Sequence, residues 1–128
     1  MSPRNGPIDH AAHFELAEQN ELLARGLCNL GSSFNDWVVT ICFYAAKHYT
    51  TSKMTSLTTD PGNHSLFLQE VANAYRPASS VYSSLRYLFD LSMNARYLPK
   101  IAKKYKNTPK YQQKAFEALE KLKAELGI

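Results

Sequence analysis

The segment from residue 36 to residue 49 is apolar around nearly its whole circumference and ends in a cationic and aromatic cluster. At about 3.6 residues per turn, one stripe of a helix over this segment carries Trp37, Ile41, Tyr44 and His48. The adjoining stripe is apolar as well, so few sides of the helix remain for water. This pattern predicts a helix in the middle of a helical bundle.

Apolar residues recur with helical spacing in four further segments, which are separated by turn-forming residues. Asp9 is a suitable N-terminal cap for the first helix, Ser33 or Asn35 for the second, and Pro109 suits the first turn of the last. The chain lacks a strand pattern of convincing length. We therefore predict an all-α fold, an antiparallel up-and-down bundle of four to five helices. The predicted helices cover about 9–30, 36–54, 64–75, 79–98 and 108–126.

The apolar positions of three of these helices indicate the sides that we expect to face the core. In the first helix they are Phe14, Leu16, Leu22, Leu23, Leu27 and Leu30. In the fourth they are Val81, Leu85, Leu88, Ser92 and Ala95. In the last they are Ala115, Phe116, Leu119, Leu122 and Leu126. We expect the last helix to be the most peripheral.

A chain of 128 residues suits a single domain with one core. We divide it into an irregular N-terminus (1–8), a helical bundle (9–99), and a basic connector plus an amphipathic helix packed on the bundle (100–128). No segment has the apolar length of a signal peptide or a membrane span, so we expect a cytoplasmic protein without membrane contact. The spacing of Cys28 and Cys42 is not that of a metal site, and we predict neither metal nor cofactor.

The formal net charge of +4 is unevenly distributed along the chain. From residue 100 onward there are eight lysines and three glutamates, a local charge of +5, whereas the preceding residues sum to −1. A basic segment with interleaved tyrosines fits attraction to a phosphate backbone combined with stacking on bases. The alternative is a solvated connector. The candidate nucleic-acid-binding residues are Lys103, Lys104, Lys106, Lys110, Tyr105 and Tyr111.

Two stretches of sequence resemble the small prokaryotic HEPN-like proteins. Asp-Trp-Val-Val-Thr at 36–40 runs into Phe-Tyr-Ala-Ala-Lys-His-Tyr at 43–49, which is similar to the second helix of that family. Asn63, His64 and the segment 82–97 are similar to its later part. The resemblance implies a helical bundle, often homodimeric, that cleaves or binds RNA or nucleotides in toxin–antitoxin, anti-phage and CRISPR-linked systems.

Ribonuclease members of that superfamily carry an arginine followed four to six residues later by a histidine. Late in the chain this pattern is missing, because no histidine follows Arg76, Arg86 or Arg96 at that spacing. Arg4 and His10 have the permitted spacing, but a glycine and a proline lie between them in the irregular N-terminus, so we do not expect a catalytic pair there. The resemblance therefore favours a binding domain more than a nuclease.

His48 and Arg96 are the candidate catalytic residues. An imidazole at the end of the second helix can act as acid or base near neutral pH, and a guanidinium beside it would bind phosphate oxygens. The alternatives are a core histidine, and an Arg96 that forms a structural ion pair with Asp36. Candidate supporting residues are His64, Arg86 and Tyr97, and Asp90 is the expected partner of Arg86.

These observations predict an RNA- or nucleic-acid-binding HEPN-like domain of a prokaryotic defence or toxin–antitoxin system. One alternative is a non-catalytic module that binds a partner protein, and a second is a metal-independent ribonuclease. We expect a homodimer, with RNA or a protein such as a nucleotidyltransferase as a further partner.

Overall fold

The computed structural model describes residues 6–76, 79–97 and 110–128, and these confirm the predicted all-α class. Within those ranges, none of the helices combines the length and apolar character needed to cross a membrane. The 3-10 turn η1 (Ser32–Phe34) lies between the first two helices. The α-helices are α1 (His10–Cys28), α2 (Asn35–Lys53), α3 (His64–Ala74), α4 (Ser80–Tyr97) and α6 (Lys110–Glu125).

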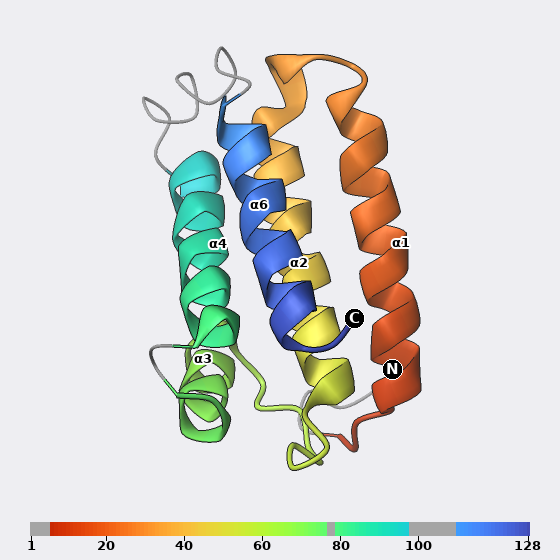
Figure 1. Ribbon diagram of the computed structural model, residues 1–128, viewed down its shortest axis with the longest axis vertical. Coiled ribbons are helices and arrows are strands. Elements are labelled where there is room, and N and C mark those ends of the chain that lie inside the picture. The colour runs from red at the N-terminus through yellow and green to blue at the C-terminus, as the bar shows by residue number, and fades with distance from the viewer. Residues whose placement is uncertain (1–5, 77–78, 98–109) are drawn as a thin grey trace.

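The four longer helices run along the long axis of the molecule in alternating directions, as an up-and-down bundle does (Figure 1). α1 and α4 flank α2 on opposite sides, α6 lies across a third side of α2, and the short α3 lies at one end beside α4. α2, α4 and α6 pack against one another, whereas α1 packs mainly along α2. α2 is therefore the central element, as the sequence predicted.

Side chains near the helix starts explain two of the boundaries. The Asp9 carboxylate accepts a hydrogen bond from the Ala12 N–H at 3.0 Å, and the Asn63 side chain accepts one from the Leu66 N–H at 2.8 Å. The prediction of Ser33 or Asn35 as the cap of α2 was wrong, because Phe34 holds that position and makes no side-chain capping bond. The 3-10 turn η1 ends at Phe34, and α2 begins at the next residue without a side-chain cap.

α6 is part of the core, which corrects the expectation that the last helix is peripheral. Ala115, Leu119 and Leu122 are fully buried and lie on the side of α6 that meets α2 and α4. The predicted inward stripe of α4 is confirmed, because all five of its residues are buried. Apolar spacing was a reliable guide in α4, whereas in α6 two of the five predicted residues, Phe116 and Leu126, are only half-buried.

α1 corrects the sequence prediction in a different way. Its contact side consists of Ala17 and Ala24, which are fully buried, whereas four of its predicted inward leucines are 44–75% exposed. Alanines let the two helix backbones approach closely, and the larger leucines then lie outside the contact. The exposed leucines are Leu16, Leu22, Leu23 and Leu30.

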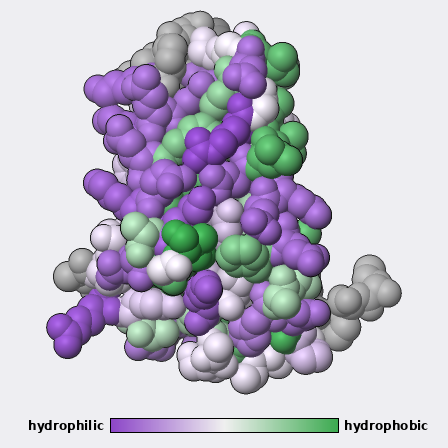
Figure 2. Space-filling view, turned by 45° about the vertical axis from the view of Figure 1, so that its right-hand side comes forward, coloured by the Kyte–Doolittle hydropathy of each residue, from purple (hydrophilic) through white to green (hydrophobic). Residues whose placement is uncertain are grey.

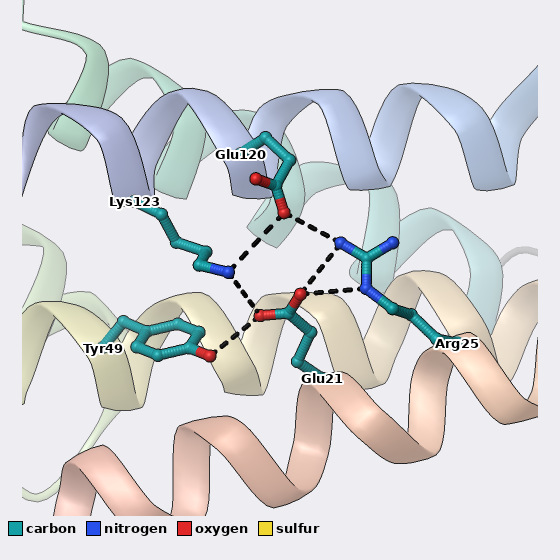
Figure 3. A network of polar contacts seen from close by, with 5 residues as sticks. All are labelled: Glu21, Arg25, Tyr49, Glu120 and Lys123. Carbon is teal, nitrogen blue, oxygen red and sulfur yellow. Dashed lines mark hydrogen bonds and ion pairs between the residues drawn. The ribbon is translucent and has the colours of Figure 1, made fainter. Parts of the chain in front are cut away.

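A polar network holds α1 to α2 and α6 (Figure 3). The Glu21 carboxylate accepts hydrogen bonds from the Tyr49 hydroxyl at 2.8 Å, Lys123 Nζ at 2.9 Å and Arg25 Nε at 2.9 Å. Glu120 extends the network by pairing with Arg25 at 2.8 Å. Burial alone would raise the pKa of Glu21, but these hydrogen bonds outweigh it and lower the pKa below its usual value.

Removal of the Glu21 carboxylate is expected to destabilise the fold, because Lys123 and Tyr49 would lose a partner in a buried setting. Glu21→Ala should lower the free energy of unfolding by about 2–4 kcal/mol. Urea titration followed by circular dichroism measures this loss. Glu18→Ala is the matched control, since Glu18 lies one turn earlier on α1 and is exposed, so it should cost less than about 0.5 kcal/mol. Equal losses in the two variants would contradict a special role for Glu21.

Candidate functional site

One stripe of α2 is only partly covered by the other described helices. Trp37 is 56% exposed, and Ile41, Tyr44 and His48 are half-buried. The stripe lies on the side of α2 opposite Asn35, Cys42 and Ala46, which are fully buried. The expectation that α2 is enclosed on nearly all sides was therefore wrong for this stripe, because α1, α4 and α6 cover only three sides.

A second stripe on α1 lies next to it. His13, Leu16, Asn20, Leu23 and Leu27 recur at alternating spacings of three and four residues, which places them on one side of α1. Contact between His13 and His48 joins the two stripes at one end. We call their combined surface the α1–α2 surface. It consists of His13, Leu16, Asn20, Leu23, Leu27, Trp37, Ile41, Tyr44 and His48.

The α1–α2 surface is unusual for this molecule, because none of its nine residues is an acid, a lysine or an arginine. The face of the molecule shown in Figure 2 is mostly hydrophilic, and its hydrophobic residues occur in small groups. Exposed apolar side chains that adjoin one another, unlike scattered ones, are typical of a contact surface.

The His13–His48 pair is the closest polar contact on this surface. The two Nδ1 atoms are 2.7 Å apart, so one nitrogen donates a proton and the other accepts it. Burial, and then the charges of His13 and Lys47, lower the pKa of His48 to about 4. Burial also lowers the pKa of His13, against an opposing effect of Asp60. Both rings are thus neutral at pH 7.

A second polar group lies on the other side of α2. Lys47 Nζ is 3.3 Å from Nδ1 of His64, and Nε2 of His64 is 3.4 Å from the Tyr44 hydroxyl. The rings of Phe43 and Phe89 lie 5.2 and 5.8 Å from the imidazole. Burial, followed by the charges of Lys47 and Arg96, lowers the pKa of His64.

The structure does not bring His48 and Arg96 together. The rings of Phe43 and Phe89 are 5.4 Å apart and set the register between the antiparallel α2 and α4. His48 lies five residues beyond Phe43, and Arg96 lies seven residues beyond Phe89 in the opposite direction. At about 1.5 Å per residue their Cα atoms are about 18 Å apart along the axis, too far for a catalytic pair.

Arg96 instead lies at the same level along the bundle axis as Asp36, its alternative partner in the sequence analysis. Its Nε donates to the Ser92 carbonyl at 3.2 Å, its Nη2 is 3.6 Å from the Met93 sulfur, and it lies over the Tyr97 ring. Among the residues that the structure describes, no ion pair joins Arg96 to Asp36. The guanidinium is therefore held by its own helix.

The remaining predicted residues are dispersed. Arg86 pairs with Asp90 at 3.5 Å as expected, and both side chains are more than half exposed. Tyr97 is exposed at the end of α4. Lys110 and Tyr111 begin α6, where Lys110 is exposed and Tyr111 is half-buried. Four predicted nucleic-acid contacts lie outside the described residues, namely Lys103, Lys104, Tyr105 and Lys106.

Sequence reasoning missed the partner of His48. His13 was visible as a histidine three residues after His10, but its pairing depends on how α1 and α2 are aligned, which periodicity does not give. Within the described ranges no group of three metal-binding side chains is present, and His10 donates instead to the Met54 and Leu57 carbonyls.

Comparison with known protein families, curated proteins and solved structures gave no match. The HEPN-like resemblance thus stays a prediction that depends on the residues of α2, His64 and α4.

The low pKa of His48 predicts a specific loss of stability in acid. A histidine whose pKa is lowered in the folded state is protonated first in the unfolded state, so the free energy of unfolding falls as the pH drops from about 6.5 towards 4. Carbon-detected NMR of the imidazole should place the His48 midpoint near 4. In His48→Gln the fall in stability over this window should be shallower. A midpoint near 6.5 would contradict the buried, neutral pair.

Proposed function

We propose that this chain is a helical interaction domain that pairs with a second copy of itself through the α1–α2 surface. The observation that carries the proposal is the exposure of Trp37, the largest side chain of the central helix, together with that of Leu16 and Leu23 on α1. Tryptophan is enriched among the residues that dominate binding energy at protein interfaces.

The size of the surface supports this proposal. Leu16, Leu23 and Trp37 are 44%, 52% and 56% exposed, and the other six residues are half-buried. With full areas of roughly 180–250 Å² for residues of this size, the surface offers about 500–600 Å² per copy. Specific protein interfaces begin at about 600 Å² per partner, so these nine residues supply most of the smallest standard interface and neighbouring residues must supply the rest.

The spacing and charge of the surface favour a second copy as the occupant. Alternation of three and four residues on both helices is the pattern by which helices pack side by side at small crossing angles. Two such helix pairs related by a two-fold axis form a four-helix contact. Because none of the nine residues carries a fixed charge, pairing brings no like charges together.

This proposal agrees with the homodimer that the HEPN-like resemblance implies, and with a place in a defence or toxin–antitoxin system. A different partner protein, such as a nucleotidyltransferase, would use the same surface but leave the isolated chain monomeric. A ribonuclease receives no support from the geometry, since His48 and Arg96 are separated along the bundle.

Nucleic-acid binding is a second candidate function, and the distribution of charge favours it. The described residues carry ten basic and eleven acidic side chains, a net charge of −1, whereas the residues outside them contribute five basic side chains and no acid. Four of these are lysines within 98–109, directly before Lys110 and Tyr111. We therefore assign RNA binding to this connector, while the helical body supplies the contact between copies.

Adjacent leucines on α1 provide a sharp test of the dimer. Leu23→Glu places a carboxylate in the α1–α2 surface and, in a symmetric dimer, does so twice, so the dimer dissociation constant should rise at least 100-fold. Leu22→Glu is the matched control, because Leu22 is 75% exposed and lies outside the surface; it should change the constant less than threefold.

Sedimentation equilibrium at neutral pH measures both constants, with circular dichroism to verify folding. A monomeric wild-type chain, or equal weakening by the two substitutions, would refute the proposed surface.

The connector is tested by charge reversal at two matched sets of positions. Replacement of Lys103, Lys104 and Lys106 by Glu should weaken binding of a single-stranded RNA at least tenfold and flatten its salt dependence. The matched control replaces Lys53, Arg76 and Arg86 by Glu. It changes the net charge by the same amount but on exposed positions of the helical body, so it should weaken RNA binding much less. Fluorescence anisotropy over a salt series compares the variants, and equal losses would mean that only net charge matters.

A further inference from the structure

Half-buried cations are rare among the described residues, and only one of them has a carboxylate partner. Lys123 is paired with Glu21, whereas Lys47 and Arg96 have no carboxylate within ion-pair distance in the part of the chain that the structure describes. Lys47 lies over the Phe67 ring at 5.3 Å, and burial lowers its pKa. Partly desolvated positive charge without a counter-ion is unfavourable unless an anion binds there.

The hydrogen-bonding groups around His64 are mostly donors. An ammonium group only donates, so Lys47 requires Nδ1 of His64 to accept. The proton of His64 is then on Nε2, where it points to the Tyr44 oxygen. The hydroxyl hydrogen of Tyr44 is thereby left to donate elsewhere. Lys47 and Tyr44 thus present N–H and O–H groups beside an imidazole.

Arg96 adds a second cation on the same side of α2. Its guanidinium folds back along α4 to Ser92, about one helical turn (~5 Å) from the level of Phe89, whose ring contacts His64. Burial and Lys47 have larger effects on the pKa of His64, and the charge of Arg96 lowers it further. Lys47 and His64 are in contact, whereas the Cα atom of Arg96 lies about 16–17 Å from that of Lys47 along the axis.

We propose that Lys47, Tyr44 and His64 form a binding site for a phosphate group at the edge of the α1–α2 surface, and that the positive charge of Arg96 adds to the attraction from further along α4. Ammonium and guanidinium groups bind phosphate through charge-assisted hydrogen bonds, and a phenol adds a neutral donor. The phosphate comes either from a small phosphate compound or from the backbone of RNA. The site does not require self-association, although Tyr44 belongs to both the site and the α1–α2 surface.

Two further groups act on this site. Asp60 raises the pKa of Lys47, although the two side chains are not within ion-pair distance. The Oδ1 atom of Asp60 accepts a hydrogen bond from the Gly62 N–H at 2.8 Å. His64 gains a positive charge in acid, which adds to the attraction for an anion. Because protonated His64 attracts an anion more strongly, bound phosphate must raise the pKa of His64. For the same reason, phosphate should bind more tightly as the pH falls through the range in which His64 gains its proton.

Titration of the full chain with inorganic phosphate tests the site, with the His64 ring signals observed by NMR at constant ionic strength in chloride. Phosphate should shift the His64 midpoint upward. Lys47→Met keeps an unbranched side chain but removes the ammonium charge, and should weaken phosphate binding at least tenfold. Lys53→Met is the matched control, since it removes an exposed lysine from the end of the same helix; it should leave the affinity unchanged within about twofold.

Tyr44→Phe provides a second variant if Lys47→Met does not fold: it removes the hydroxyl donor beside His64 and should also weaken phosphate binding. A short single-stranded RNA without terminal phosphates distinguishes the sources, because it shifts the His64 midpoint only if the site accepts backbone phosphate. The proposal is overturned if neither inorganic phosphate nor this RNA moves the His64 midpoint, or if Lys47→Met and Lys53→Met bind phosphate equally.

Discussion

The buried carboxylate of Glu21 fixes the rotation of α1 about its own axis. Ala17 and Ala24 permit close contact with α2, but two small side chains alone define an orientation poorly. Glu21 lies on one side of these alanines and is bound by Tyr49 and Lys123, while His13 lies on the other side and is bound by His48. These polar contacts on both sides of the alanines determine which leucines of α1 lie outside its contact with α2.

This constraint explains why the sequence predicted some helices well and α1 poorly. In α4 and α6 the most hydrophobic stripe is also the buried one, so periodicity identified the core correctly. In α1 the leucines and the packing side are different sets of residues, and hydrophobicity alone favours the leucines. Which side of α1 faces the core is decided by the contacts of Glu21 with α2 and α6. Such tertiary contacts are not visible in the periodicity of a single helix.

The prediction for α2 failed for another reason. A helix that is apolar on every side must be covered on every side, but the sequence does not say whether the cover comes from the same chain or from another. Three sides of α2 are covered by α1, α4 and α6, and the side with Trp37 is the one that we propose a second copy covers. His48 was recognised as a polar candidate, whereas its relation to His13 and its separation from Arg96 followed only from the alignment of neighbouring helices.

Lys47 connects the two regions that we assign to binding. Successive residues of a helix point about 100° apart, so Lys47 meets His64 while His48 meets His13 on the α1 side. The charge of Lys47 lowers the pKa of all three histidines. An anion that neutralises this charge makes His13 and His48 easier to protonate. Because charge within the α1–α2 surface opposes pairing, phosphate binding and self-association are expected to oppose each other in acid.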